Sequence, residues 1–529
     1  YGVQTLAQLL ALDKLPLAEV TDYPDVPYRG VVEGFYGAPW SQEARIRQLD
    51  FYGRNKMNVY IYGPKDDPYH RTPNWRKPYP AREGEELKVL VNRAKENNVI
   101  FYWAIHPGQD IRWNEEDRSL LLQKFESMYQ LGVRGFAVFF DDISGEGTKA
   151  DKQAELLNYI DDHFVKVKRD VAPLILCPTE YNKSWTDVEG GYLTTLGDKL
   201  NEGIKVMWTG DMVVATIDKS TLDFVNPLLK RKAYIWWNFP VSDYVQDHLL
   251  LGPVYGNGLD IKDDMSAFVS NPMEHAEASK ISLYSVADYT WNMENYDSET
   301  SWKHAVRDLM PLHAEYLEIF AAHNSDPGQN GHRFRREESV AIQPALSALL
   351  KAYQEKNEID EDAYRQVAEE CRKIIVAADG LLASGNENRP LITEIRPWLI
   401  QFKQVGEYGA EVLNMIRLRQ QKDAFIGSYE HARALLVLMG ETDAQYKAGI
   451  KSGSLHLMPT FNALFEAATT GYNAAFHAGL DTKAVYSPYT LKSDVNQLAS
   501  LPIQQKGKVN TIIPSNEVIN WQAGGCLLY

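Results

Sequence analysis

The sequence has 529 residues, which is too many for one compact core and predicts two or three domains. Its content of 44% hydrophobic and 24% charged residues is ordinary for a soluble globular protein. The formal net charge is −16 and no basic stripe stands out, which argues against a nucleic acid or an anionic membrane surface as a partner. No apolar run approaches the ~20 residues that a membrane-spanning helix needs.

Cysteine and aromatic content narrows the class of protein further. Cys177, Cys371 and Cys526 lie far apart, and no CxxC or Cys/His spacing indicates a zinc site, so we expect neither a disulfide framework nor a metal or other cofactor. The 30 Tyr and 12 Trp residues are core packing residues by default. Because sugars also bind to aromatic faces, these residues mildly favour a carbohydrate ligand.

The chain opens with residues 1–25, which we interpret as the tail of an α/β domain that is mostly absent. From about residue 29, short apolar runs alternate with amphipathic segments such as 84–98, in which apolar residues recur at helical spacing. The runs are near-continuous in apolar residues, as in parallel strands that are buried on both faces. We expect strands over 29–37, 58–65, 99–107, 134–142, 173–181, 205–210, 233–240 and 281–291.

This alternation predicts an α/β fold, a (β/α)8 TIM barrel over residues 26–330. A doubly wound open sheet is the structural alternative. No GxGxxG or GxxxxGK[ST] motif follows the first predicted strand, so a dinucleotide-binding or P-loop protein lacks its main support.

The strand signal disappears after the predicted barrel. Residues 331–478 contain several amphipathic stretches joined by short polar loops, which predicts an α-helical bundle. The bundle either buttresses the barrel or forms the interface of a homodimer. Residues 479–529 turn β-prone, and we interpret them as the start of a β-rich C-terminal region. The fold class is therefore a TIM barrel followed by a helical bundle, with remnants of flanking domains at both ends.

Polar and aromatic side chains gather at the ends of the predicted barrel strands, which is where the chemistry of a TIM barrel takes place. They are Gly34 and Tyr36 at the first strand, Lys65 at the second, Asp141 and Asp142 at the fourth, Cys177 and Tyr181 at the fifth, Thr209 at the sixth, Trp236, Asn238 and Asp243 at the seventh, and Asn271 in the loop before the eighth.

Asp141 and Asp142 place two like charges where a buried apolar run stops. A solvated turn or a helix N-cap explains most such pairs. An acid/base site is the alternative, because two carboxylates about 4 Å apart repel by ~4 kcal/mol at an effective dielectric constant near 20. This repulsion would raise the pKa of one of them from ~3.9 toward neutrality, less so with Lys65 nearby. One carboxyl would then stay protonated while the other stays ionised, as a general acid with a charged helper requires.

Adjacent carboxylates do not suit the usual retaining glycosidase, whose two carboxylates stand on opposite sides of the sugar. Successive residues of a strand point to opposite faces, so neighbours rarely fill those two places. Adjacent carboxylates do suit a scheme in which the 2-acetamido oxygen of the substrate attacks the anomeric carbon. One Asp then holds the acetamide N–H, and its neighbour protonates the leaving oxygen.

Six motifs in one order carry a resemblance to a known family. They are RGVVEGFYGAPWS, NVYIYGPKDDPYH, FAVFFDDISGEG, CPTEYNKSW, MWTGD and YIWWNFPVSDY. Together they resemble glycoside hydrolase family 84, the O-GlcNAcases and related bacterial β-N-acetylglucosaminidases. The resemblance runs from about residue 1 to 475 and more loosely into the tail.

The resemblance implies a role for each residue at the strand ends. Asp141 matches the carboxylate that orients the acetamide, Asp142 the general acid/base, and Tyr181 the phenol that binds the acetamide oxygen as an oxazoline forms. The residues that match sugar-hydroxyl ligands are Gly34, Lys65, Asn238, Asp243 and Asn271. Those that match the pocket walls are Tyr36, Cys177, Thr209 and Trp236. Apart from the resemblance, we interpret His106 as a packed histidine at a strand end.

The implied function is a retaining hydrolase that removes O-linked N-acetylglucosamine from Ser or Thr, with N-acetylglucosamine-bearing glycoproteins or glycans as its partners. A hyaluronidase-like enzyme or another β-N-acetylhexosaminidase is the near alternative. A non-catalytic glycan-binding barrel is the alternative from a different class. We expect a periplasmic or secreted bacterial protein, with a cytoplasmic one as the alternative.

Overall fold

The computed structural model of the chain describes residues 1–10, 18–487 and 519–522. They form two compact units, each described by itself below. Most of the predicted C-terminal region over 479–529, including Cys526, lies outside the described residues.

The first unit is built on a closed barrel of eight parallel strands, β2 to β9, which follow one another in chain order. The strands are β2 (Tyr28–Glu33), β3 (Val59–Tyr62), β4 (Ile100–Ile105), β5 (Gly135–Phe139), β6 (Ile175–Cys177), β7 (Lys205–Trp208), β8 (Ala233–Trp237) and β9 (Met265–Ser270). β9 closes the barrel by pairing with β2, in a register that places Tyr28 opposite Ala267. The predicted TIM barrel is confirmed.

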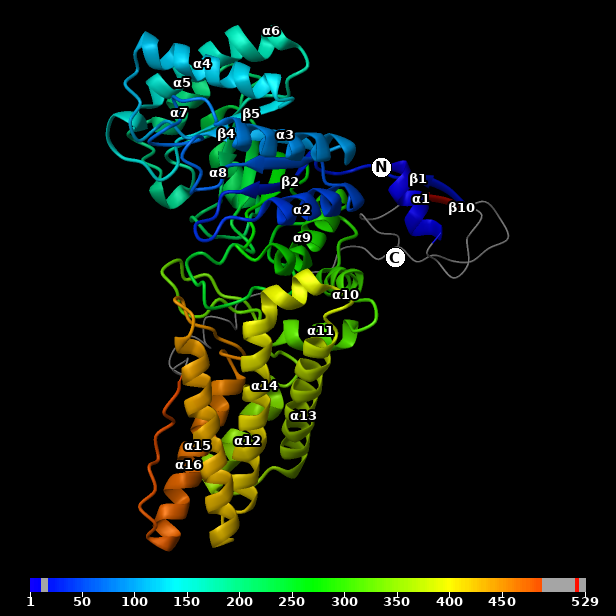
Figure 1. Ribbon diagram of the computed structural model, residues 1–529, viewed down its shortest axis with the longest axis vertical. Coiled ribbons are helices and arrows are strands. Elements are labelled where there is room, and N and C mark those ends of the chain that lie inside the picture. The colour runs from blue at the N-terminus through cyan, green and yellow to red at the C-terminus, as the bar shows by residue number, and fades with distance from the viewer. Residues whose placement is uncertain (11–17, 488–518, 523–529) are drawn as a thin grey trace. The chain divides into compact units, whose positions relative to one another are not determined.

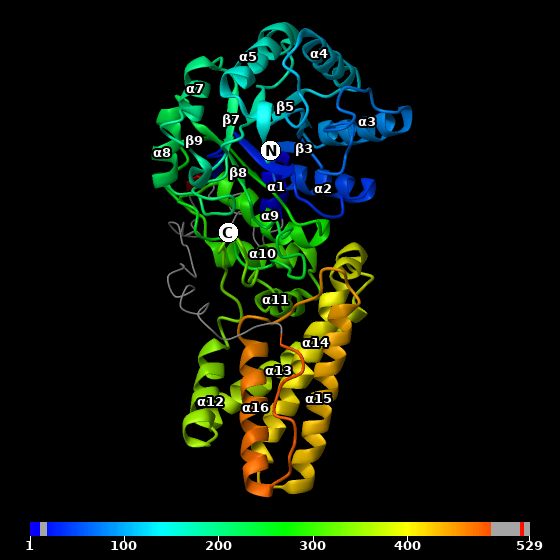
Figure 2. The same ribbon diagram turned by 90° about the vertical axis from the view of Figure 1, so that its left-hand side faces the viewer.

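Helices surround the barrel, as Figures 1 and 2 show. They are α2 (Gln42–Arg54), α3 (Ala81–Glu96), α4 (Glu115–Gln130), α5 (Ala150–Ile160), α6 (Lys166–Lys168), α7 (Tyr192–Lys199), α8 (Lys219–Leu229) and α9 (Ala276–Trp291). Side-chain caps fix several starts: the Ser41 hydroxyl accepts from the Ala44 N–H, and the Asn114 side chain accepts from the Asp117 N–H. Such caps help set where each strand-end loop stops and its helix begins.

The predicted eighth strand over 281–291 is wrong, because these residues lie inside α9. Every residue of α9 is buried, so the helix lacks the polar face that would reveal its period in the sequence. The true eighth strand, β9, is six residues long and contains two serines. Asn271 therefore follows the last barrel strand directly and lies at its carboxyl end.

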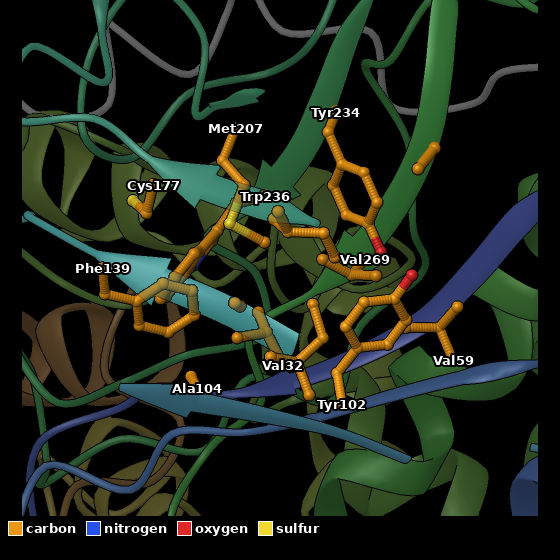
Figure 3. Packing of buried hydrophobic residues seen from close by; sticks show 14 of the residues in the cluster. Val32, Val59, Tyr102, Ala104, Phe139, Cys177, Met207, Tyr234, Trp236 and Val269 are labelled. Carbon is orange, nitrogen blue, oxygen red and sulfur yellow. The ribbon is translucent and has the colours of Figure 1, made fainter. Parts of the chain in front are cut away.

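The barrel interior is filled by side chains from alternate strand positions, and it is no open channel. Figure 3 shows Val32, Val59, Tyr102, Ala104, Phe139, Cys177, Met207, Tyr234, Trp236 and Val269 converging from different strands. The rings of Phe139 and Trp236 contact each other with their centroids 5.3 Å apart. This layer forms the floor under the carboxyl ends of the strands.

A short helix and a small sheet complete the first unit. Helix α1 spans Gly2–Leu10, and strand β1 (Ala18–Thr21) pairs in parallel with β10 (Ile519–Gln522). Segments near the two ends of the sequence thus lie side by side.

The second unit contains residues 244–252 together with 302–487. Its helices are α11 (Ala314–Ala322), α12 (Gln343–Lys356), α13 (Glu361–Ala383), α14 (Arg389–Arg417), α15 (Lys422–Ala444) and α16 (Leu457–Phe476), while α10 (Ser298–Leu309) runs from the first unit into it. Helices α13 to α16 lie side by side in Figures 1 and 2. The predicted helical bundle is confirmed.

Residues 244–252 come from the connection between β8 and β9 but belong to the helical unit. The Trp398 indole donates to the main-chain oxygen of Asp247 at 2.9 Å. The His248 ring lies 3.0 Å from the Ser454 hydroxyl through Nε2. Hydrogen bonds to α14 and to the loop before α16 therefore hold this segment.

Candidate active site

All the predicted site residues lie at or just beyond the carboxyl ends of the barrel strands. This arrangement follows from the fold, because parallel strands that close into a barrel bring all their carboxyl ends to one face. Residues that are more than 200 positions apart in sequence meet there: the Gly34 N–H lies 3.3 Å from the Asn271 side-chain oxygen.

Asp141 is the buried member of the carboxylate pair and lies two residues beyond β5. Its Oδ2 accepts a hydrogen bond from the Lys65 ammonium at 2.5 Å, and its main-chain oxygen lies 2.8 Å from His106 Nε2. Burial by itself would raise the pKa of Asp141, but the opposite charge of Lys65 lowers it to about 2. Asp141 is therefore ionised, and its Oδ1 has no hydrogen-bond partner among the described residues.

Asp142 is the exposed member of the pair, and its backbone adopts the left-handed conformation with φ of +54°. Asp tolerates this conformation better than most side chains, and such residues cluster at functional sites. The Tyr181 hydroxyl donates to its Oδ1 at 2.8 Å, and the Tyr36 hydroxyl donates to its Oδ2 at 2.9 Å. The left-handed turn accounts for how two successive residues both join one cluster of polar groups.

The two tyrosines keep their hydroxyl protons. Burial, assisted by the negative charge of Asp142, raises the pKa of Tyr181 far above its ordinary value. Burial also raises the pKa of Tyr36, although Lys65 opposes the shift. The Lys65 ammonium stands 5.1 Å above the Tyr36 ring, which places one cation beside both carboxylates.

Three of the four predicted wall residues lie below the strand ends, and the fourth, Tyr36, is exposed. Cys177, Thr209 and Trp236 are all buried. Burial raises the pKa of the Cys177 thiol well above its ordinary value, so the sulfur is neutral and a poor nucleophile. A Cβ on Gly34 would lie 2.5 Å from the Trp236 ring, so the chain approaches this indole as closely as only glycine permits.

Three further polar residues join the ends of β2, β8 and β9. The Asn238 side-chain oxygen accepts from the Trp236 indole at 2.9 Å and from the Asn271 amide at 3.0 Å. Asp243 accepts from the Tyr36 N–H at 2.9 Å. The structure thus brings all the predicted site residues together, and their individual roles toward a sugar stay predictions.

His106 is buried at a strand end, as predicted for a packed histidine, but its hydrogen bond to Asp141 was not predicted. It follows β4 directly, so its place at a strand end was the one signal available.

Among the described residues, no group of three or more His, Cys, Asp or Glu side chains is placed to hold a metal ion. In the same part of the chain, no helix is both long and apolar enough to cross a bilayer.

Models of known families match three successive parts of the chain. The β-N-acetylglucosaminidase family matches residues 29–322, which is more than half of the chain. The bacterial GH84 post-catalytic domain matches residues 338–465, and carbohydrate-binding module family 32 matches residues 480–528.

Individual relatives agree with this assignment. The rat (Rattus norvegicus) and mouse (Mus musculus) proteins named Protein O-GlcNAcase are each 35% identical over 276 residues, which is 50% of this chain and 30% of theirs. The chain thus matches less than a third of the length of these relatives. The solved structure of CpGH84B is 34% identical with a TM-score of 0.77, over 84% of this chain and 78% of that one. A mutant of the Thermobaculum terrenum O-GlcNAc hydrolase is 25% identical with a TM-score of 0.73, over 86% and 98%.

A TIM barrel with two adjacent carboxylates at its strand ends, one paired with a lysine and one held by two phenols, defines the site of a glycoside hydrolase. Together with the family match, this site settles the assignment. The chain belongs to glycoside hydrolase family 84, the family of β-N-acetylglucosaminidases.

Proposed function

We propose that this chain is a retaining hydrolase that removes O-linked N-acetylglucosamine from Ser or Thr of glycoproteins, with the substrate's own acetamide as the nucleophile. The single observation that carries the proposal is the unequal pair of carboxylates: Asp141 is buried and ionised with one free oxygen, and Asp142 is exposed between two phenols. The names of the curated relatives support the substrate.

Asp141 is suited to hold the acetamide. Lys65 keeps the Asp141 carboxylate ionised, and an ionised carboxylate is an acceptor for the acetamide N–H. As the acetamide oxygen attacks the anomeric carbon, positive charge develops on the amide nitrogen. An ionised carboxylate in a buried setting stabilises that charge more strongly than one in water.

Asp142 is suited to move the proton. It is exposed, and both its oxygens already accept hydrogen bonds from tyrosine hydroxyls. In the first step it gives its proton to the leaving oxygen of Ser or Thr, and an oxazoline forms. In the second step it removes a proton from the water that opens the oxazoline, so the anomeric configuration is retained. The Tyr181 hydroxyl, which donates to Asp142 in this structure, would turn its one O–H to the acetamide oxygen when the sugar binds.

Asp142→Asn tests the proposal. Because general acid catalysis contributes about 10²- to 10⁴-fold, we expect kcat/KM to fall by that order for an O-linked glycopeptide and far less for an activated aryl N-acetylglucosaminide. Kinetics with both substrates measures the difference, and Asp151→Asn, at the exposed start of α5, is the matched control. Tight inhibition of the unmodified chain by a thiazoline mimic of the oxazoline is expected as well.

Two results would contradict the proposal. Equal hydrolysis of a substrate that carries a 2-hydroxyl in place of the acetamide would exclude the acetamide nucleophile. Binding of N-acetylglucosaminides without any turnover would favour a glycan-binding barrel instead.

The cellular location and the oligomeric state of the protein are separate proposals. A periplasmic or secreted location rests on the match to a bacterial family domain. A homodimer through the helical bundle is supported by a hollow of about 520 Å³ between α13, α14 and α15, where the apolar side chains Ile375, Ala410, Ala434, Leu435 and Leu438 lie beside Glu407, Glu411 and His431. Leu438 is 44% exposed there, and sedimentation velocity measures the assembly directly.

A further inference from the structure

His106 lies directly beneath the buried carboxylate and has no assigned part in the reaction. It is 1% exposed, and its main-chain N–H donates to the His70 main-chain oxygen at 2.7 Å. Its ring nitrogen Nε2 lies 2.8 Å from the main-chain oxygen of Asp141 and 3.5 Å from Asp141 Oδ1. His106 thus lies beside both the main chain and the carboxylate of Asp141.

The partner of Nε2 defines the state of the ring. A carbonyl oxygen can only accept, so Nε2 carries a proton. Burial lowers the pKa of His106 below its ordinary value, against the opposing influence of Asp141, so the ring is neutral. Nδ1 is then the unprotonated nitrogen, and it has no hydrogen-bond partner among the described residues. The one N–H of this ring is therefore committed to Asp141.

The same region ties two strand-end loops together. His70 Nδ1 lies 3.0 Å from the Ala104 carbonyl of β4, and Arg71 donates to the Lys65 main-chain oxygen at 3.0 Å. The loop after β3, which carries Lys65, is thereby fixed to the end of β4, which carries His106. One connected assembly holds Asp141 at Oδ2 through Lys65 and at its main-chain oxygen through His106.

We propose that His106 is a positioning residue of the hydrolysis: its Nε2–H fixes the Asp141 main chain, and with it the place of the carboxylate that is to hold the acetamide N–H. This inference rests on the proposed function. A general acid role for His106 does not fit because its single N–H is directed at a carbonyl oxygen, and a general base role does not fit because its unprotonated Nδ1 is buried. The reactive geometry needs such support, since a shift of about 1 Å in a reacting group can cost on the order of 10²-fold in rate.

Two substitutions separate the hydrogen bond from the space that the ring fills. His106→Phe keeps a ring of similar size and removes the donor, and His106→Gln keeps an N–H that can reach the Asp141 carbonyl. We expect kcat/KM to fall about 10- to 100-fold in His106→Phe and to stay within about 3-fold of the unmodified chain in His106→Gln. Because Asp141 acts on the acetamide, the loss is expected to be equal for good and poor leaving groups, unlike the loss in Asp142→Asn. The inhibition constant of the thiazoline mimic should rise in parallel with the loss of kcat/KM.

His323→Phe is the matched control. His323 is also buried and hydrogen-bonded through both ring nitrogens, to Ser339 and Glu370, but it lies in the helical unit. We expect it to lower the melting temperature without changing kcat/KM at a temperature where the protein is folded.

The outcomes are distinguishable. If the unmodified chain hydrolyses no N-acetylglucosaminide, the proposed function itself fails. If it is active and a folded His106→Phe matches it, or the loss depends on the leaving group, the positioning role is wrong. Should His106→Phe not fold, a soluble His106→Gln that loses as much activity as Asp141→Ala overturns the role equally.

Discussion

At the scale of single residues, Lys65 sets the charge of the site. Its ammonium and the Asp141 carboxylate are both largely buried and lie 2.5 Å apart. Removing one partner of a buried ion pair leaves an uncompensated charge and typically costs about 3–5 kcal/mol. In Lys65→Met the opposite charge is lost, so burial should raise the pKa of Asp141. We therefore expect a large loss of kcat/KM and an acid limb of the pH–rate profile that moves to higher pH.

The ion pair of Lys65 and Asp141 also makes the stability of the fold depend on pH. The lowered pKa of Asp141 gives stability that is complete above the unfolded value of ~3.9 and is lost as pH falls toward about 2. The raised pKa of Lys65 gives stability that is complete below ~10.4 and is lost at higher pH. The melting temperatures of the unmodified chain and Lys65→Met should thus differ most between about pH 4 and 10 and converge in acid. Lys152→Met, at an exposed surface position, is the control and should show no such convergence.

The site residues were predictable at this scale, but the strength of their electrostatic contacts was not. Motif order placed Asp141, Asp142 and Tyr181 at strand ends, where the structure has them. Like-charge repulsion, weakened by Lys65, predicted one ionised and one neutral carboxyl, and the contact with Lys65 lowers the pKa of Asp141, as the ionised member requires. Sequence spacing contains no distances, so it could not weigh the repulsion against a contact of 2.5 Å.

At the scale of elements, the fit between neighbouring strands depends on Gly30 in β2. A Cβ at this position would lie 1.8 Å from the Val59 main-chain oxygen of β3, and backbone atoms cannot move aside cheaply. We expect Gly30→Ala to destabilise the barrel by about 3 kcal/mol or more, at or above the upper end for overpacking. Gly84→Ala in α3 is the matched control: nothing lies within 4 Å of its added Cβ, and Ala is favoured over Gly in helices by about 1 kcal/mol. The melting temperature should therefore fall in Gly30→Ala and rise in Gly84→Ala. A Gly30→Ala chain as stable as the unmodified one would contradict the close approach.

Helices with a polar face and strands with a bounded apolar run were predictable, whereas a fully buried helix and a strand without such a run were not. Seven barrel strands and the bundle helices showed clear periods or bounded apolar runs. α9 is buried on every side, so its sequence resembles a buried strand, and β9 was missed because Met265–Ser270 is short and rich in small polar residues. Only the requirement that the barrel close, with β9 pairing to β2, identifies both.

At the scale of the whole molecule, the order of barrel and bundle was predictable, but the membership of one segment was not. Residues 244–252 lie between two barrel strands in sequence and yet belong to the helical unit. Their hydrogen bonds to Trp398 and Ser454 join positions about 150 and 206 residues apart. Such partners leave no local pattern in the sequence.

The net charge of −16 predicts which charge is favoured in the residues that flank the sugar in a peptide substrate. Charged ligands feel this field most at low ionic strength, because the Debye length falls from ~30 Å at 0.01 M to ~8 Å at 0.15 M salt. We expect kcat/KM for an O-linked N-acetylglucosamine peptide flanked by lysines to fall as salt is added, and that for a glutamate-flanked peptide to rise, so that the two converge. A neutral aryl N-acetylglucosaminide is the control and should show little change. Faster hydrolysis of the acidic peptide at low salt would mean that the charges around the site outweigh the field of the whole chain.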